Sequence, residues 1–424
     1  MSILSLREHQ RLTIGGGPGT DLTRTQAAAL ARLEPALPKG VLAWCHHSVC
    51  FGAFCGVVQA GDLTIEILPK LQGSLDDPDG TRRCLVAMLR LAGERLAATI
   101  DVADLALHQH HLLDVFILDF CRRTTTLLHR GPIRRYVDEE ENLTKLRGRL
   151  HLPGQMRHNL VNQARLYCRY DEFSLDNAHN RALKHALRVM LDLAVGGAAR
   201  REANVLLRRL EDVAAMKVRA EDVEALPFDR TIAPWQPLFT RAAAFLRNLH
   251  PDVAAGGAAS FGLLFDMNRL FEAFVAAVAA RDWGREGRRV VAQGPQRYFA
   301  AHGDASVFRM RPDIAVLDRE DHVLLVADAK WKAVDAGLAD LGLAQGDVYQ
   351  LAAYAARYDC QQVALLYPSS PAMPAGLMRR YALKDGHGTD LLAYGLDLPA
   401  LIAGERLPLP PHRPFGNRAY ATKT

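Results

Sequence analysis

The chain has 424 residues and a formal net charge of +5 at pH 7. We therefore expect two or three globular domains, with a mild positive charge that is compatible with nucleic acid but does not demonstrate its binding. Seven scattered cysteines favour a reducing, cytoplasmic setting, and the lack of any long uncharged apolar stretch or signal-peptide run predicts neither a membrane span nor secretion.

Residues 1–75 are predicted to form a β-rich N-terminal region. Short apolar runs bounded by glycine, aspartate or proline indicate strands at 40–44, 54–60 and 63–68. In the last run, polar residues at 64 and 66 alternate with apolar ones, which predicts a half-exposed strand. The glycine-rich segment 15–20 lacks the lysine of a phosphate-binding loop, so we expect a turn there.

Residues 76–255 are predicted to be mainly helical, with basic loops. Asp176 and Asn177 are typical residues for the N-terminal cap of a helix. Between Cys121 and Tyr170 there are eleven Lys or Arg residues against four Asp or Glu residues, and 131–170 is predicted to be loop-rich. Such a region suits a phosphate backbone, an acidic protein partner or plain solvation, and the sequence leaves these alternatives open. Helical periodicity is visible at 82–96, 105–130, 178–195, 199–217 and 238–249.

Two clusters of histidine and cysteine are weak candidates for metal sites. Cysteines and histidines at 45–55 have a spacing that fits tetrahedral zinc poorly, so we favour buried or unreactive cysteines. Histidines at 108–111 lie in a predicted helix, where an exposed patch is favoured over a metal site.

Residues 256–402 are predicted to form a C-terminal α/β domain after a glycine- and alanine-rich boundary at 251–260. The expected order is helix, strand (288–300), two further strands, helix, strand (362–367) and two late strands within 379–395. This order predicts a mixed sheet with helices on both faces, so the fold class of the chain is mixed α+β. Residues 403–424 are rich in proline and basic groups and are predicted to be a flexible tail.

The most informative stretch is a predicted hairpin with strands at 309–318 and 323–331. If residues 319–322 form the loop, Asp318 pairs with Val323, and counting back places Asp313 opposite Asp328. Lys330 lies two residues beyond Asp328 and therefore points to the same face. Two carboxylates and an ammonium would then converge where an apolar strand ends, and a one-residue slip of the register would separate them.

These residue types indicate phosphodiester chemistry. Two aspartates and a nearby backbone carbonyl are hard ligands suited to Mg²⁺, and a lysine beside them would stabilise charge on a phosphate. In the following helix, Gln350 and Tyr354 are spaced i,i+4 and share a face. The alternative is a surface hairpin that carries an ordinary salt bridge.

Together, Pro312-Asp313, Asp328-Ala329-Lys330 and Gln350-x-x-x-Tyr354 resemble the signature of the PD-(D/E)xK nucleases. The helical segment 265–275 resembles the helix that opens this core in the McrC family, and segments 65–71, 141–150 and 170–177 also resemble McrC proteins. McrC is the nuclease subunit of McrBC-type, modification-dependent restriction systems.

The resemblance implies a site that holds Mg²⁺, or Mn²⁺ as a substitute, through Asp313, Asp328 and the backbone carbonyl of Ala329. It implies that Lys330 stabilises the transition state or helps to deprotonate water, and that Gln350 positions the water. A helix acid can join such sites, which corresponds to Glu272, and the alternative for Glu272 is a solvated helix residue. The implied catalytic set is Asp313, Asp328, Lys330, Gln350, Glu272 and Tyr354.

The resemblance also implies partners: double-stranded DNA, a homodimer assembled on DNA, and a McrB-like AAA+ GTPase or ATPase that binds residues 1–75 and recognises modified DNA. The chain has no complete Gly-x-x-x-x-Gly-Lys-Ser/Thr motif, so nucleotide hydrolysis must come from such a partner. Two other functions stay open: a stand-alone PD-(D/E)xK nuclease in DNA repair or defence, and a non-catalytic activator of an AAA+ ATPase.

Overall fold

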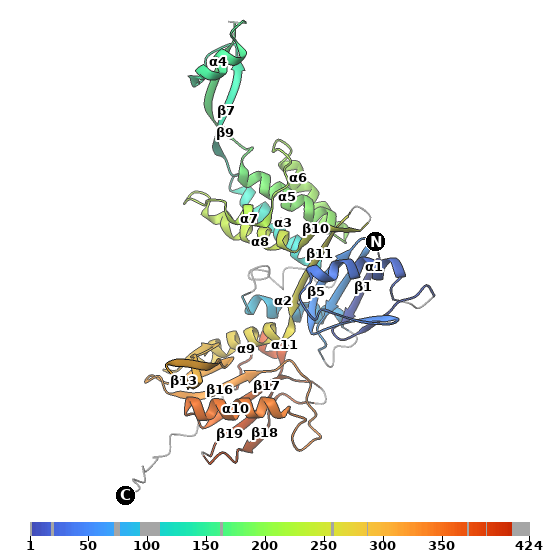
Figure 1. Ribbon diagram of the computed structural model, residues 1–424, viewed down its shortest axis with the longest axis vertical. Helices are drawn as coiled ribbons and strands as arrows, with labels where there is room; N and C mark the ends of the chain where they lie inside the picture. Colours follow the sequence, from blue (N-terminus) through green and yellow to red (C-terminus); the bar gives the residue numbers. More distant parts are fainter. Residues whose placement is uncertain are drawn as a thin grey trace. The chain divides into compact units, whose positions relative to one another are not determined.

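The computed structural model forms two compact units, each of which is described here by itself (Figure 1). One unit comprises Met1–Val58, Asp62–His108 and Leu264–Thr424, and the other comprises Gln59–Gly61 and Gln109–Leu263. The residues that the structure describes are 2–17, 21–71, 77–93, 111–161, 164–255, 258–285, 287–370, 373–386 and 388–408. Part of the predicted turn at 15–20, part of the histidine patch at 108–111 and most of the predicted tail lie outside these ranges.

The first unit begins with β-strands, as predicted for the N-terminal region. Strand β6 runs parallel to β1 and is fully buried, so the prediction of a half-exposed strand is wrong. The cause is an internal ion pair: Nε of Arg82 lies 2.8 Å from Oε1 of Glu66, and Ser5 also donates to this carboxylate. The elements are β1 (Ser2–Arg7), β2 (Arg11–Thr13), α1 (Arg24–Leu33), η1 (Glu34–Ala36), β3 (Leu42–Cys45), β4 (Ser48–Phe51), β5 (Phe54–Ala60), β6 (Leu63–Leu68) and α2 (Pro78–Leu91).

The C-terminal part of this unit is built on a six-stranded mixed sheet in the order β12-β15-β16-β17-β19-β18. Helix α9 packs on β12, β15 and β16, and helix α10 packs on β16 and β17. We call this assembly the C-terminal module, and it confirms the predicted mixed sheet flanked by helices. Its elements are α9 (Met267–Trp283), β12 (Arg289–Ala292), β13 (Arg297–His302), β14 (Ala305–Met310), β15 (Ile314–Leu317), β16 (Val323–Ala329), α10 (Gln345–Tyr358), β17 (Gln362–Pro368), β18 (Gly376–Ala382), β19 (Asp390–Leu396) and α11 (Leu398–Ile402).

Two predicted strands of this module are each divided in the structure. The predicted strand 288–300 forms β12 and β13, and the predicted strand 309–318 forms β14 and β15. Strands β13 and β14 pair only with each other, in a separate two-stranded sheet, among the residues that the structure describes. Pro312 explains the second division, because proline lacks a backbone N–H and restricts the residue before it.

The second unit is mainly helical, and the predicted helices at 178–195, 199–217 and 238–249 are confirmed as α5, α6 and α8, except that α6 ends at Arg209 rather than at 217. An ion pair between Arg241 and Asp119 is buried in it, with 2.6 Å between Nη1 and Oδ2. Its elements are α3 (Leu112–His129), β7 (Arg135–Leu143), β8 (Arg149–Leu150), α4 (Leu152–His158), β9 (Leu166–Ser174), α5 (Ala178–Leu193), α6 (Gly197–Arg209), α7 (Ala220–Glu224), η3 (Ala233–Trp235), α8 (Gln236–Arg247), β10 (Leu249–Ala255) and β11 (Ala258–Asp266).

The segment predicted to be loop-rich, 131–170, contains β-structure instead: β7 pairs with β9 along nine residues. The segment 251–260, predicted as a domain boundary, lies within the β10–β11 hairpin. The acidic run of β7 is a poor strand former by composition. It is stabilised across the ladder, where Nε of Arg169 donates to Asp138 at 2.8 Å and the hydroxyl of Tyr170 donates to Glu141 at 2.8 Å.

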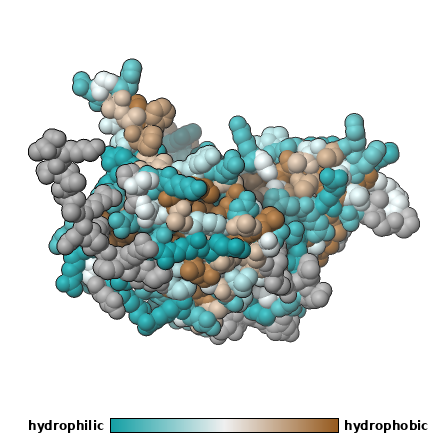
Figure 2. Space-filling model, turned by 90° about the horizontal axis from the view of Figure 1, so that it is seen from below, coloured by the Kyte–Doolittle hydropathy of each residue, from teal (hydrophilic) through white to brown (hydrophobic). Residues whose placement is uncertain are grey.

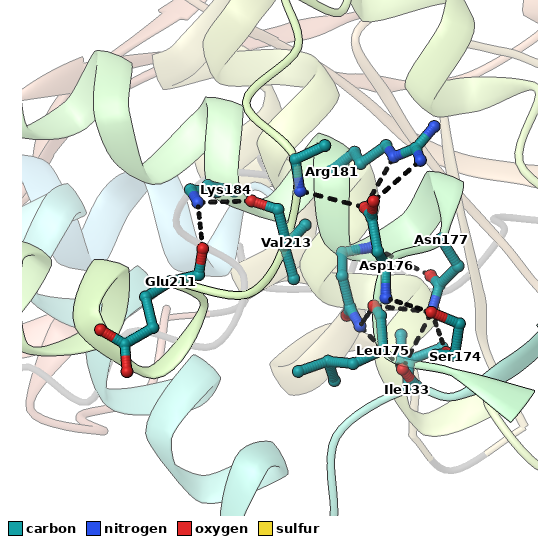
Figure 3. Close-up of polar contacts among 11 residues, drawn as sticks. Ile133, Ser174, Leu175, Asp176, Asn177, Arg181, Lys184, Glu211 and Val213 are labelled. Carbon is teal, nitrogen blue, oxygen red and sulfur yellow. Dashed lines mark hydrogen bonds and ion pairs between the residues drawn. The ribbon is translucent and has the colours of Figure 1, made fainter.

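The predicted cap of α5 is confirmed for Asn177 (Figure 3). Its Oδ1 accepts the backbone N–H of Asn180 at 3.1 Å, and its Nδ2 donates to the carbonyl of Ile133 at 3.0 Å. Asp176 has a different role, because it forms an ion pair with Arg181 at 2.7 Å. These residues of the sequence motif are therefore structural.

The surface seen in Figure 2 carries several separate apolar patches among hydrophilic residues. None of the helices within the described part of the chain is long and apolar enough to cross a membrane.

Candidate active site

The candidate site lies where β15 and β16 end on the C-terminal module. Ile314 pairs with Ala327 and Ala315 with Val326, and continuing this register by one residue places Asp313 opposite Asp328, as predicted. The predicted pairing at the turn is wrong, because a bulge pairs Val323 with Leu317 rather than with Asp318.

Asp318 closes the turn with its side chain instead of joining the ladder. Its Oδ1 accepts the backbone N–H groups of Glu320 at 2.8 Å and His322 at 2.9 Å. The bulge therefore shifts the pairing by one residue only near the turn. The rest of the hairpin keeps the predicted register, which brings the two acids together.

Both aspartates are buried: Asp313 is 9% exposed and Asp328 is 2% exposed. Oδ2 of Asp313 accepts the N–H of Ala329 at 3.0 Å, and Nε2 of Gln293 donates to its Oδ1 at 3.3 Å. Burial, followed by the adjacent charge of Asp328, raises the pKa of Asp313 to about 8. Without a cation, the two carboxylates resist being charged at the same time, which is the electrostatic condition that a bound metal relieves.

Lys330 provides one positive charge beside these acids. Its Nζ lies 2.5 Å from Oδ2 of Asp328, which confirms that the two side chains share a face. Burial alone would lower the pKa of Lys330, but the charges of Asp328 and Asp347 outweigh it, and the net shift is upward. At neutral pH this side chain is therefore an ammonium ion, suited to stabilising negative charge.

Asp347, on α10, is a site residue that the sequence reasoning missed. Its Oδ1 lies 3.6 Å from Nζ of Lys330, and its Oδ2 lies 3.1 Å from Nζ of Lys332. The sequence spacing could have identified it, because Asp347 precedes Gln350 by three residues and therefore lies on the same face of the helix.

Gln350 and Tyr354 lie together on α10, as their spacing predicted. Nε2 of Gln350 donates to the hydroxyl of Tyr354 at 3.0 Å. Burial raises the pKa of Tyr354 despite this hydrogen bond, and the charges of Asp328 and Asp313 add to the rise. The phenol of Tyr354 therefore stays protonated at neutral pH. Its hydroxyl accepts the hydrogen bond from Gln350 and so fixes the orientation of the Gln350 amide.

Glu272 approaches the same acids from α9. Burial, and then the charge of Asp328, raise the pKa of its carboxyl group. The half-buried position of Glu272 and this interaction place it near the candidate site rather than on an open helix face.

The donor set fits Mg²⁺ through two carboxylates and one carbonyl. No group of three or more His, Cys, Asp or Glu side chains arranged for a metal is found among the residues that the structure describes. Magnesium keeps several waters, however, and needs only one or two carboxylates. In an extended strand, the N–H and C=O groups of one residue point to the same side. Because the N–H of Ala329 donates to Asp313, the carbonyl of Ala329 points toward that acid as well.

The segment after Lys330 is fixed by Glu8, in the turn that follows β1, which the sequence reasoning also missed. Nε1 of Trp331 donates to Oε1 of Glu8 at 2.8 Å, and the same oxygen accepts the N–H of Lys70 at 2.8 Å. Burial raises the pKa of Glu8. The Trp331 ring also packs against Phe271 of α9, with ring centroids 5.3 Å apart.

The comparisons with known proteins agree with this architecture. A family model described as McrBC 5-methylcytosine restriction system component matches residues 49–368, and a search of curated proteins found no match. A structure described as a refined half-complex from the tetradecameric assembly of Thermococcus gammatolerans McrB AAA+ hexamers with bound McrC is similar, with a TM-score of 0.70 and 19% identity over 93% of this chain and 94% of that chain. A cryo-EM structure of the Thermococcus gammatolerans McrBC complex gives a TM-score of 0.50 and 21% identity over 67% and 89% of the two chains.

Proposed function

Because this chain belongs to the McrC family of McrBC 5-methylcytosine restriction system components, we propose that it is the Mg²⁺-dependent DNA endonuclease subunit of such a system. The observation that carries the proposal is the convergence of Asp313, Asp328 and Lys330 at the ends of β15 and β16. Two buried acids that resist joint ionisation, with an ammonium ion beside them, suit cleavage of a phosphodiester better than a structural salt bridge.

The metal would be held by Asp313, Asp328 and the Ala329 carbonyl. When bound, Mg²⁺ supplies positive charge for the scissile phosphate and makes a neighbouring water more acidic. The hydrogen bonds from Ala329 and Gln293 keep Asp313 in place for this role.

Lys330 stabilises the negative charge that develops on the phosphate as the water attacks. Its raised pKa means that it holds its proton at neutral pH, which favours this role over that of a general base. Gln350, whose amide is oriented by Tyr354, would position the attacking water or a phosphate oxygen.

The partner in this proposal is a McrB-like AAA+ motor, bound through the N-terminal region. Support comes from the structure described as McrB AAA+ hexamers with bound McrC, which this chain resembles over nearly its full length. The chain itself lacks a complete Gly-x-x-x-x-Gly-Lys-Ser/Thr motif, so in this proposal the motor supplies nucleotide hydrolysis. We also assign the recognition of modified DNA to the motor.

The test is cleavage of a plasmid carrying 5-methylcytosine by the full chain with its AAA+ partner, GTP and Mg²⁺. The wild-type protein should cleave, and Asp328→Asn should lose at least about 100-fold in rate while keeping its melting temperature and its assembly with the partner. Glu320→Gln removes an exposed carboxylate of the same module, in the turn between β15 and β16 and away from the aspartates, and serves as the matched control. Wild-type rates from Asp328→Asn would contradict the assignment, and cleavage without the partner would favour a stand-alone nuclease.

A further inference from the structure

A two-stranded ribbon projects from the C-terminal module beside the candidate site. It consists of β13 and β14, residues 297–310, and we call it the aromatic ribbon (Figure 1). Its exposed aromatic side chains are Tyr298 (42% exposed), Phe299 (58%) and Phe308 (74%). A lone two-stranded ribbon is marginal in water, and three exposed aromatic rings on it indicate a surface built to meet a ligand.

The base of the ribbon is fixed to the C-terminal end of α10, the helix that carries Gln350 and Tyr354. Nη1 of Arg297 donates to the carbonyl of Arg357 at 2.9 Å, and Nε of Arg357 donates to the carbonyl of Tyr298 at 2.7 Å. The hydroxyl of Tyr358 donates to the carbonyl of Met310 at 3.2 Å. The ribbon is therefore held in a definite position relative to the site, as a recognition element requires.

The ribbon is also close to the acids along the chain. Strand β14 ends at Met310, three residues before Asp313, and three residues span at most about 11 Å. A DNA strand whose phosphate reaches Asp313 must therefore pass near the base of the ribbon.

The charge of the ribbon matches such a strand. Residues 297–311 contain three arginines and one acid, Asp304 at the tip. Arg309 and Arg311 are exposed, and no carboxylate among the described residues forms an ion pair with either of them. A two-stranded β-ribbon fits the major groove of DNA, with arginines on phosphates and apolar side chains against base edges.

Phe308 adds a conformational observation. Its φ is +57°, in the left-handed region, which is strained for an aromatic residue. The ladder pairs Tyr298 with Arg309 and Ala300 with Val307, and Phe308 lies between these pairs. The strain coincides with the most exposed aromatic side chain of the ribbon.

From these observations we propose that the aromatic ribbon is a DNA-binding element, in which Arg309 and Arg311 contact phosphates and Phe308 contacts bases or sugars. This inference rests on the proposed nuclease function and assigns the surface that holds the duplex next to the candidate site. An acidic protein partner is the competing occupant, but the continuity of the ribbon with Asp313 favours DNA.

The test measures binding to a fluorescent duplex by anisotropy, across a range of salt concentrations, with the full chain in the Asp328→Asn background. The double variant Arg309→Ala/Arg311→Ala should lose at least about 10-fold in affinity, and the slope of log K against log salt should fall by about 2, since each phosphate contact contributes roughly 0.9. Phe308→Ala should lose affinity severalfold and leave the slope unchanged, because it removes no charge.

The matched control is Arg289→Ala on β12, which removes one exposed arginine of the same module. Control and ribbon variants should have melting temperatures close to that of the Asp328→Asn parent. Unchanged affinity and slope in the double variant, or loss of AAA+ partner binding alone, would overturn the proposal. Binding is read without cleavage, so failure of the nuclease assignment would appear separately, in the plasmid assay.

Discussion

The substitution Asp313→Asn measures how much the buried charge of Asp313 destabilises the fold, independently of any role of Asp313 in catalysis. The pKa of Asp313 is about 8 in the metal-free protein, against an ordinary value of 3.8. The raised pKa means that folding favours the protonated form. The associated stability is fully present below about pH 4, declines as the pH rises and is lost above about pH 8.

The magnitude follows from the size of this shift. About four pKa units correspond to roughly 6 kcal/mol as an upper bound, at about 1.4 kcal/mol per unit, and relaxation of the pair reduces this to a few kcal/mol. Asparagine keeps an oxygen that can accept the N–H of Ala329 and carries no charge. The variant should therefore become more stable than the wild type as the pH rises from 4 to 8, with a melting temperature about 5–10 °C higher at pH 8.5.

The assay is thermal unfolding of the full chain from pH 5 to pH 9, in EDTA and in Mg²⁺. Mg²⁺ should raise the melting temperature of the wild type at high pH and should have little effect on Asp313→Asn, because a ligand has been removed. Asp304→Asn is the control for loss of an exposed acid. A stability difference independent of pH would show that the buried charge of Asp313 is not its cause, and equal stabilisation of both proteins by Mg²⁺ would show that Asp313 is not a ligand.

Three further predictions concern neighbouring groups. Lys330→Met should lower the cleavage rate by about 100-fold and tighten Mg²⁺ binding, because it removes a cation that competes for Asp328; weaker metal binding in calorimetry would contradict this. Asp347→Asn should lower the cleavage rate about 5-fold, since an ion pair 3.6 Å from Lys330 at a partly exposed site is worth about 1 kcal/mol, and an unchanged rate would deny it a positioning role. In the second unit, Arg241→Ala should lower the free energy of unfolding by about 1–3 kcal/mol, measured in urea, because the buried Asp119 loses one of its two arginine partners and keeps Arg123.

The sequence predicted the centre of the site because hairpin pairing depends on local counting. Away from the turn, the strands pair in the predicted register. Next to the turn a bulge shifts the pairing by one residue, and Asp318 leaves the ladder and accepts backbone N–H groups of the turn with its side chain. Periodicity likewise predicted Lys330 beside Asp328, and Gln350 beside Tyr354.

Contacts between distant segments could not be predicted in this way. Trp331 and Glu8 are 323 residues apart, and their hydrogen bond depends on how the N-terminal strands pack on the C-terminal module. Asp347 reaches Lys330 only because of the path of the irregular segment between β16 and α10, which has no periodicity to read.

Two wrong predictions concern charged residues whose partners lie elsewhere in the chain. Glu66 is buried because Arg82 neutralises it, and the acidic strand β7 forms because its carboxylates find Arg169 and Tyr170 across the ladder. Composition records the charges but not their partners.

The proposed nuclease site requires that Asp313 and Asp328 share one divalent cation. Crystals of the full chain soaked in Mn²⁺, with anomalous diffraction recorded near the manganese absorption edge, would locate that cation. We predict a peak within about 2.0–2.4 Å of both carboxylates and of the Ala329 carbonyl oxygen. Manganese bound elsewhere, with Lys330 still paired to Asp328 and no peak between the acids, would show that the two aspartates do not form a metal site.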